Sequence, residues 1–412
     1  MNNIQVVQNM DMCSGCGSCV IACPPKIIDM QVTDIHRPLV CEEDCINCGR
    51  CLDVCPNYKW NFEELSFKPL DKYFNSDIYV GYSNDSEIRM KSSSGGICTT
   101  VIKALMEQNI VDGAIVSYFD TEHMVGYPKI IYSVAELMKS SKSKYCSIPV
   151  NTILDELEEG KRYVYVGLPC HIVGLKEISK INKKVNESIV LTVGLMCGHI
   201  PTYDGIKDII KKNNKTFGLQ NLQFREEGWG VSLLDSKVDG DEIINKDYWS
   251  TYFNNYLYSV KSCIKCRNFF AEGADIVLGD AWELKSHKDY CGKGANLILA
   301  MSEEGNLILR KLSKNRQITI ETSSSRLLFS STKGNIYLKY FSSIRSEKLR
   351  IRLIRACFRG IYMFNYELVR RKKGRKFIMN CPDSIIKVSM KCVNFTKKVL
   401  IKLDTEFQAY GD

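Results

Sequence analysis

The sequence lacks any long hydrophobic run, which excludes a helical integral membrane protein. No stretch of its 412 residues approaches the ~18 consecutive apolar residues that a membrane-spanning helix needs. It also lacks the pattern of a secretory signal peptide, so its 19 cysteines are not expected to form the disulfide framework of a small secreted domain. With 45% hydrophobic and 25% charged residues, the composition is that of a soluble globular protein. We therefore expect a cytoplasmic protein of two or three domains whose cysteines are free or bound to metal.

Outside its last segment the chain carries almost no net charge. Residues 341–412 hold 17 Lys and Arg against 6 Asp and Glu, so they supply more than the whole net charge of +9. No nucleic-acid-binding module with interleaved aromatic residues accompanies these charges, and we expect no nucleic-acid partner. The basic cluster at residues 370–373 favours docking to an acidic protein partner or peripheral contact with an anionic membrane surface. A solvated helical extension that packs on the body would have the same composition, and this alternative stays open.

Two cysteine runs share the spacing Cys-x2-Cys-x2-Cys-x3-Cys-Pro and begin 32 residues apart, at Cys13 and Cys45. This is the spacing of bacterial ferredoxins, in which the fourth cysteine of each run binds the cluster of the other run. The proline after each run, Pro24 or Pro56, is expected to stop the helix and turn the chain away from the metal. We therefore predict an α+β ferredoxin-like dicluster module over residues 1–60. Its two 4Fe–4S clusters are assigned to Cys13, Cys16, Cys19 and Cys55, and to Cys45, Cys48, Cys51 and Cys23.

Beyond this module, short β-branched runs alternate with helical segments. Residues 61–77 show no clear period and are expected to be a linker. The alternation predicts an α/β sheet covered on both faces over residues 78–312, with ligands at the turns from strand to helix. Residues 313–412 are predicted to form a basic, mostly helical extension. The expected strands are 78–82, 113–119, 163–166, 189–195, 231–238, 275–279 and 296–301, and the expected helices are 96–108, 151–159, 172–179 and 203–212.

Four further cysteines stand at positions that suit a metal site. Cys170 lies where a predicted strand turns into a helix, Cys197 ends a strand, and Cys263 and Cys266 form a chelating pair. A helix N-terminus stabilises a thiolate, so Cys170 is placed to be ionised. We expect these four thiolates to meet near the sheet edge and hold a third 4Fe–4S cluster, while a structural zinc site with the same ligands stays open. Buried cysteines without a ligand are the better interpretation for Cys98, Cys146, Cys291 and Cys357.

Three serines followed by two glycines precede a predicted helix at residues 92–96. Such a turn leaves backbone N–H groups free and sterically open, which suits a phosphate. A serine cap before a glycine pair is also common for structural reasons, so both interpretations stay open. Lys144 and Arg225 are candidate anion contacts, although solvated surface charge explains them equally well.

Several of these segments, in their order along the chain, resemble the family of coenzyme F420 hydrogenase/dehydrogenase beta subunits. The matching segments are 92–96 (SSSGG), 143–145 (SKY), 167–171 (GLPCH), 195–197 (LMC), 263–266 (CIKC) and 274–282 (ADIVLGDAW). The dicluster module in front resembles the family members that carry their own ferredoxin domain. The basic tail after about residue 315 departs from the shared pattern.

The resemblance implies FAD held without a covalent bond in the α/β domain, near an iron–sulfur cluster. Some relatives exchange electrons with the deazaflavin coenzyme F420, and others reduce a tetrapyrrole with electrons from ferredoxin. The histidines His171, His199 and His287 are candidate proton donors near the flavin, although ordinary hydrogen bonding is the favoured interpretation for each. The cofactor-binding residues that the resemblance implies are Ser92, Ser93, Ser94, Gly95, Gly96, Lys144, Tyr145, Asp280 and Trp282.

These observations predict an iron–sulfur, flavin-dependent oxidoreductase. Clusters carry single electrons, whereas a flavin converts between one- and two-electron chemistry. Electrons would pass between the ferredoxin-type clusters and FAD, and on to an organic acceptor or donor such as coenzyme F420 or a cell-surface polysaccharide precursor. The expected protein partner is a ferredoxin or a hydrogenase- or dehydrogenase-type subunit. The alternative is a non-catalytic electron-relay subunit of a larger redox complex, whose partner holds the substrate site.

Overall fold

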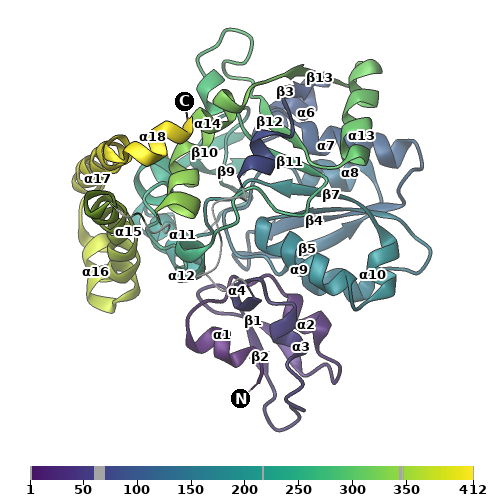
Figure 1. The fold of residues 1–412 in the computed structure, drawn as a ribbon, viewed down its shortest axis with the longest axis horizontal. Coiled ribbons are helices and arrows are strands. Elements are labelled where there is room, and N and C mark those ends of the chain that lie inside the picture. The colour runs from purple at the N-terminus through teal and green to yellow at the C-terminus, as the bar shows by residue number, and fades with distance from the viewer. Residues whose placement is uncertain (1, 60–69, 216–217, 343–345, 347, 412) are drawn as a thin grey trace.

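The computed structural model describes residues 2–59, 70–215, 218–342, 346 and 348–411 (Figure 1). Residues 61–69 of the expected linker, which was predicted over 61–77, lie outside the described residues. Its described end contains the short helix α5 (Asp71–Phe74), which leads into the first strand of the main sheet.

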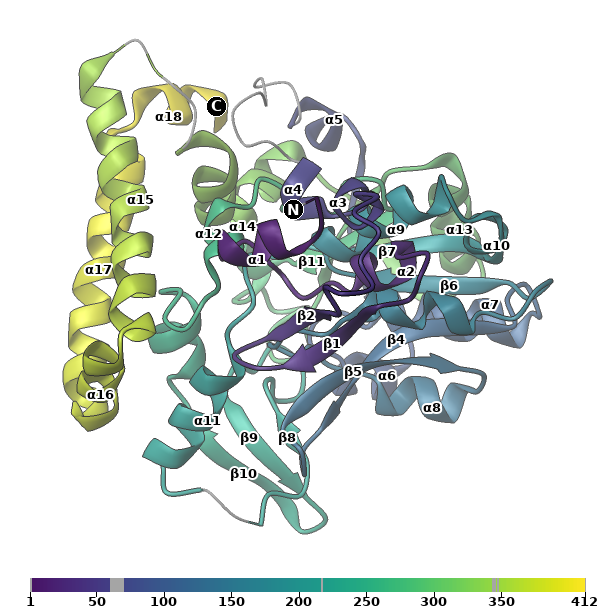
Figure 2. The same ribbon diagram turned by 90° about the horizontal axis from the view of Figure 1, so that it is seen from below.

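The N-terminal module consists of four short helices and one antiparallel hairpin, as expected of a ferredoxin-like module (Figure 2). Gly17 and Gly49 occupy equivalent positions in the two cysteine runs, and both have left-handed backbone angles, with φ of 84° and 76°. Pro56 was expected to stop a helix, but it is the first residue of α4 (Pro56–Lys59). The fixed φ angle of proline suits this first helical position. The elements are α1 (Gln5–Asn9), α2 (Ser18–Ala22), β1 (Ile28–Val32), β2 (His36–Val40), α3 (Arg50–Asp53) and α4 (Pro56–Lys59).

An eight-stranded mixed sheet forms the body, in the order β13-β3-β12-β11-β7-β6-β4-β5. Its centre is parallel, since β4, β6, β7 and β11 run in one direction, and its remaining pairs are antiparallel. The α/β prediction is confirmed, but the sheet continues past residue 312 because β13 pairs with β3. The strands are β3 (Asp77–Ser83), β4 (Gly113–Asp120), β5 (Val125–Ile131), β6 (Tyr163–Gly167), β7 (Ile189–Leu195), β11 (Ile276–Asp280), β12 (Asn296–Ala300) and β13 (Ile318–Thr322).

Helices cover both faces of this sheet, because its central strands are apolar on both sides. In β4, Ala114 and Val116 pack with one set of helices while Ile115 packs with the other. The expected helix over 151–159 is instead a 3-10 helix that ends at Glu156. One face carries α7 (Ile97–Glu107), α8 (Val134–Lys139) and α13 (Glu303–Lys314), and the other carries η1 (Val150–Glu156), α9 (Pro169–Ser179) and α10 (Lys183–Ser188).

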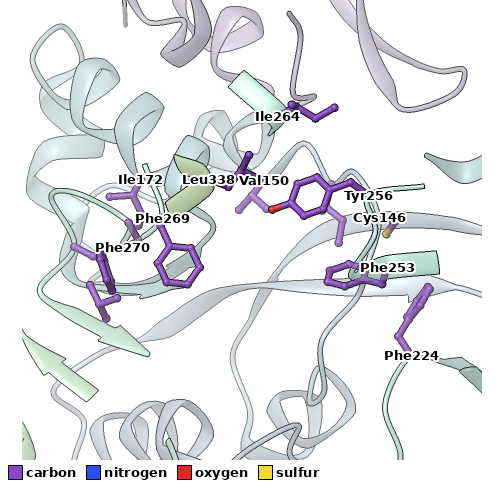
Figure 3. Packing of buried hydrophobic residues seen from close by; sticks show 14 of the residues in the cluster. Cys146, Val150, Ile172, Phe224, Phe253, Tyr256, Ile264, Phe269, Phe270 and Leu338 are labelled. Carbon is purple, nitrogen blue, oxygen red and sulfur yellow. The ribbon is translucent and has the colours of Figure 1, made fainter. Parts of the chain in front are cut away.

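A long insertion between β7 and β11 adds a small antiparallel sheet and an aromatic cluster. Figure 3 shows Phe224, Phe253 and Tyr256 on one side of the large core, with Phe269 and Phe270 on the other. The insertion contains α11 (Tyr203–Lys212), β8 (Leu222–Gln223), β9 (Leu233–Lys237), β10 (Gly240–Asn245), η2 (Tyr248–Phe253) and α12 (Lys261–Lys265).

The C-terminal extension is helical, as expected, and its long helices stack beside the body (Figures 1 and 2). The ion pair between Arg355 and Asp404 is almost fully buried and joins the first long helix of the extension to the last turn before the C-terminal helix. Among the described residues, no helix is both long and apolar enough to span a bilayer. The helices are α14 (Ser325–Ile336), η4 (Tyr337–Phe341), α15 (Leu349–Arg370), α16 (Lys372–Asn380), α17 (Asp383–Leu403) and α18 (Thr405–Gly411).

Candidate redox site

The structure gathers the twelve candidate ligand cysteines into three groups. The first cysteine group is Cys13, Cys16, Cys19 and Cys55, all buried. Burial raises the pKa of the Cys19 thiol well above its ordinary value, and the thiolates of the other three members add to the rise. Four mutually repelling thiolates in a buried site need a cation to balance them, and iron supplies that charge in a cluster.

The second cysteine group is Cys23, Cys45, Cys48 and Cys51, which together line a small apolar cavity beneath the N-terminus. Burial raises the pKa of Cys51, and repulsion from Cys23 adds to this shift. The amide of Asn3 donates a hydrogen bond to Cys45 Sγ at 3.5 Å. Each run therefore contributes three cysteines to one group and its fourth to the other, as the spacing predicts.

The third cysteine group is Cys170, Cys197, Cys263 and Cys266. Burial raises the pKa of Cys170 well above its ordinary value. Repulsion from Cys16 and from the other three members of the group raises this pKa further, but by less than burial does. Among the described residues, no three His, Cys, Asp or Glu side chains are close enough to hold a single metal ion. A cubane needs no such close convergence, since each thiolate binds its own iron corner.

A buried lysine that the sequence did not single out lies beside the third cysteine group. Lys339, from η4, is 2% exposed and donates a hydrogen bond to the main-chain oxygen of Cys263 at 3.1 Å. Burial disfavours its charge, but the nearby thiolates of Cys266, Cys263 and Cys197 raise its pKa above the ordinary value. The lysine is therefore a fixed positive charge next to three candidate ligands.

The first and third cysteine groups meet where the ferredoxin-like module packs on the body. Ser18 contacts Cys16 Sγ at 3.3 Å and accepts a hydrogen bond from the Asn151 amide, which also donates to the main-chain oxygen of His171. Gly174 in α9 permits this approach, because a Cβ atom there would overlap Ser18 Oγ. A short polar bridge thus connects the loop of one group to the helix that carries Cys170.

A cavity of about 330 Å³ lies at the carboxyl ends of the parallel strands, within the usual size range of ligand sites. It is lined by all but one of the nine residues that the resemblance assigns to a flavin, and by Cys197 of the third cysteine group. The exception is Gly95. A Cβ atom there would lie 2.5 Å from the Gly81 carbonyl and 2.8 Å from the Asn296 nitrogen, so its role is close packing.

The serine turn is held by its own hydroxyl groups. Ser92 donates to the Ile88 carbonyl at 2.7 Å, and Ser94 donates to the Ala295 carbonyl at 2.6 Å. Ser93 Oγ accepts the Ser143 N–H at 2.7 Å. The structural interpretation therefore accounts for these hydroxyls, and a ligand would meet mainly the backbone of the turn.

Arg225 ties three predicted residues together beneath this turn. It is fully buried, donates to Tyr145 Oη at 3.1 Å, and pairs with Asp280 at 3.3 Å. It also donates to the main-chain oxygen of Ser93. Trp282 lies over the guanidinium, 5.3 Å from ring centre to Cζ. Arg225 is thus no solvated surface charge, and it positions the cavity wall.

Lys144 lines the cavity but its ammonium group is directed at main-chain carbonyls. It donates to the oxygens of Ser140, Ser141 and Lys142, the last two at 2.9 Å. Burial, with a smaller contribution from the charge of Lys142, lowers the pKa of Lys144 to about 7 against the opposing effect of Cys146. Near neutral pH this side chain can therefore exist with or without its charge.

Several buried polar atoms on the cavity wall have no hydrogen-bond partner within the described part of the chain. They are both ring nitrogens of His199 and the hydroxyls of Ser141 and Ser331. The His199 ring stacks on Tyr256 with ring centroids 3.8 Å apart. Each unpaired buried group costs about 1–3 kcal/mol unless something pairs it, so the cavity wall suits a ligand that carries polar groups.

The other two histidines, His171 and His287, make ordinary polar contacts, as the favoured interpretation expected. His171 accepts the Leu168 N–H at Nδ1, and burial lowers its pKa to about 4. His287 is exposed beside Asp289. The prediction that four further cysteines are buried is confirmed for Cys146 and wrong for Cys291 and Cys357, which are exposed, while Cys98 is half-buried.

The chain matches three family models: a 4Fe–4S dicluster domain over residues 12–58, and the N- and C-terminal parts of the coenzyme F420 hydrogenase/dehydrogenase beta subunit over 78–155 and 160–326. It is 24% identical to a coenzyme F420-dependent sulfite reductase of Methanocaldococcus jannaschii over 330 residues, which is 75% of this chain and about half (49%) of that relative. It is 26% identical to one of the subunits of the F420H2 dehydrogenase of Methanosarcina mazei, covering 68% of this chain and 79% of that one.

Among solved structures, the fold is similar to a chain of the F420-reducing [NiFe] hydrogenase complex of Methanosarcina barkeri. The TM-score is 0.53 at 19% identity, covering 67% of this chain and 93% of that chain. Because the two family halves and the dicluster domain follow one another across residues 12–326, the chain belongs to the family of coenzyme F420 hydrogenase/dehydrogenase beta subunits, with a 4Fe–4S dicluster domain in front.

Proposed function

We propose that this protein is an iron–sulfur flavoprotein oxidoreductase. The observation that carries the proposal is the position of Cys197, which belongs to the third cysteine group and also lines the cavity. Electrons that arrive at this group would therefore be next to any ligand in the cavity. We assign two clusters to residues 1–60, a third to the third cysteine group, and FAD to the cavity of the domain at 78–312.

The packing of the module supports a continuous path. Repulsion from Cys16 contributes to the raised pKa of Cys170, so the two cysteines lie near each other. Ser262 Oγ donates to the main-chain oxygen of Cys13 at 3.0 Å, which fixes the first cysteine group against the segment that carries Cys263 and Cys266. The second cysteine group lies farther out, with Cys48 exposed, which suits entry of electrons from a soluble partner.

Bound flavin would supply the conversion between single electrons and the two-electron chemistry of an organic carrier. The chain's own contribution is to hold and orient it. The backbone of the serine turn, fixed by Arg225 from below, would receive the anionic part. The stacked ring of His199 and the hydroxyl of Ser331 offer donors to the polar edge of the ring system.

The acceptor class that we favour is a deazaflavin such as coenzyme F420, because the similar proteins are named for that coenzyme. A cell-surface polysaccharide precursor is a second substrate class, and the names of these relatives give it no support. The alternative function is an electron-relay subunit in a larger complex, which is supported by one relative that is named as a dehydrogenase subunit and by the similar structure that belongs to a hydrogenase complex. A ferredoxin or a dehydrogenase-type subunit is then the partner, in the reducing cytoplasm that thiolate clusters suit.

Iron, zinc and flavin analysis of anaerobically purified protein tests the proposal. Three 4Fe–4S clusters predict about 12 iron per chain, with one FAD and no zinc, against about 8 iron for the dicluster module alone. Reduction of F420 or another two-electron carrier by the chain alone supports the enzyme. About 12 iron and one FAD without any such activity favours the relay subunit, and about 8 iron with zinc overturns the third cluster.

A further inference from the structure

The three helices α15, α16 and α17 lie against the body with one face and present the opposite face outward (Figures 1 and 2). α15 packs on α12 and η4, while α17 packs on η2 and on α15. Arg375 of α16 pairs with Asp204 and Asp208 of α11. The side of α15–α17 directed away from these contacts is called the outer face below.

On α15 the outer face is apolar along its centre and basic along both edges. Leu349, Leu353 and Phe364 are 57–66% exposed, and their spacing puts them on one stripe of the helix. Arg350 lies at one edge of this stripe, and Arg352 and Arg359 lie at the other. Within the described chain, no other element covers these large apolar side chains.

α17 repeats this pattern. Ile385, Val388 and Phe395 are 54–69% exposed and follow one another at helical spacing. Lys391 and Lys398 lie along one edge of the stripe. Phe377 of α16 is 61% exposed and adds a further apolar side chain. The two long helices pack against each other, so their stripes form parts of one surface.

The charge of this surface has one sign. Within residues 348–403, all of which the structure describes, no Asp or Glu falls among the exposed residues, since Glu367 and Asp383 are partly covered. The exposed basic residues are Lys348, Arg350, Arg352, Arg359, Arg370, Arg371, Lys372, Lys373, Lys376, Lys391, Lys398 and Lys402.

We propose that the outer face of α15–α17 docks on an anionic lipid bilayer, with both long helices lying in the plane of the interface. Exposed Phe, Leu and Ile between Lys and Arg match helices that bury an apolar face at the headgroup boundary while basic side chains contact anionic lipids. An acidic protein partner fits less well, because protein interfaces are depleted in lysine and seven of the twelve exposed basic residues are lysines. This inference does not depend on the redox function.

Vesicle sedimentation with the full-length, cluster-loaded protein tests the docking. One set of vesicles is pure phosphatidylcholine, and the other is an equal mixture of phosphatidylcholine and phosphatidylglycerol. We expect binding to the mixed vesicles, much weaker binding to the neutral ones, and loss of binding at high salt. Absence of binding to mixed vesicles at low salt, or equal binding to both kinds, overturns the proposal.

Two double variants separate the apolar from the electrostatic contribution. Phe364→Ser with Phe395→Ser, and Lys391→Glu with Lys398→Glu, should each lower partitioning onto mixed vesicles about tenfold or more. The matched controls are Val238→Ser, at a position 97% exposed on the β9–β10 turn, and Lys183→Glu with Lys314→Glu. Unchanged iron content shows that each variant is folded. Equal loss in the controls, or retention on an acidic polypeptide matrix without vesicle binding, contradicts a lipid surface.

Discussion

Lys339 Nζ lies 3.1 Å from the main-chain oxygen of Cys263, which sets a buried ammonium group among three thiols of the third cysteine group. A cluster becomes more negative when it is reduced, so this positive charge favours the reduced state. The lysine comes from η4, beyond the residues that match the family models.

Lys339→Met is therefore expected to lower the midpoint potential of the third cluster, on the order of 100 mV for a unit charge at short range. A redox titration followed by electron paramagnetic resonance measures this without reference to turnover. Lys212→Met is a matched control, because Lys212 also bonds main-chain carbonyls but belongs to the far edge of the body. An unchanged potential in Lys339→Met would show that the charge does not act on the cluster.

Cys170→Ser should remove about four iron atoms per chain and leave about eight, because the dicluster module keeps its own ligands. Serine provides no thiolate, so the third cysteine group would keep only Cys197, Cys263 and Cys266 as thiolate ligands. Cys291→Ser, at an exposed cysteine outside the cavity lining, should keep full iron content. Equal iron in both variants would refute the third cluster.

Asp280→Asn leaves the buried Arg225 without its charge partner. Breaking such a pair costs roughly 3–5 kcal/mol, and here it would also loosen the Ser93 turn that Arg225 holds. We expect flavin content to fall well below one per chain while iron content is retained. The exposed pair of Glu87 and Lys91 provides the control, since Glu87→Gln should change stability by less than about 1 kcal/mol.

Gly174→Val should separate the ferredoxin-like module from the body, because any Cβ atom at Gly174 overlaps Ser18 Oγ and approaches the Asn151 amide. After mixing with dithionite, the flavin that we propose in the cavity should be reduced at least tenfold more slowly than in the wild type. Gly360→Ala is the control, since nothing lies within 4 Å of a Cβ atom there. A wild-type rate in Gly174→Val would mean that electrons do not cross at this contact.

Stability should depend on pH through Lys397, a buried lysine of α17. Burial lowers its pKa from 10.5 to about 7. Between these two values the unfolded chain binds more protons at this position than the folded chain, so the free energy of unfolding rises as pH increases from about 7 to 10.5. Below pH 7 both states carry the charge and the full penalty of burying it applies.

Lys397→Met removes this contribution, and its free energy of unfolding should therefore change less between pH 6.5 and 9.5 than that of the wild type. Anaerobic chemical denaturation at the two pH values measures the difference. Lys402→Met, at an exposed position on the same helix, should keep the wild-type dependence. A dependence in Lys397→Met as steep as in the wild type would contradict the assignment.

The sequence predicted the residues whose chemistry dictates their spacing. Ligand cysteines must recur at fixed intervals, and a parallel strand buried on both faces must be apolar, so β4, β6 and β7 were found within a few residues. β13 was missed, because an edge strand such as Ile318–Thr322 alternates polar and apolar residues and looks like part of the extension.

The candidate site was predicted less evenly, since local motifs do not reveal which distant residues close a cavity. Asp280 and Tyr145 were named, but their link through Arg225 arises only in the folded chain. His199 was expected to be satisfied, and instead its ring nitrogens have no partner among the described residues. Lys339 lies in the predicted basic extension, whose charged side chains were expected to be at the surface.

The C-terminal extension also limits where the chain can be shortened. Similarity to the family ends at residue 326, yet Ser331 and Asn335 line the cavity and Lys339 reaches the third cysteine group from beyond that point. Tyr366, farther along, bonds Asp11 in the first module. The segment that matches the family models is thus shorter than the segment that builds the cavity wall and the surroundings of the third cysteine group, so shortening the chain at residue 326 would remove part of both together with the tail.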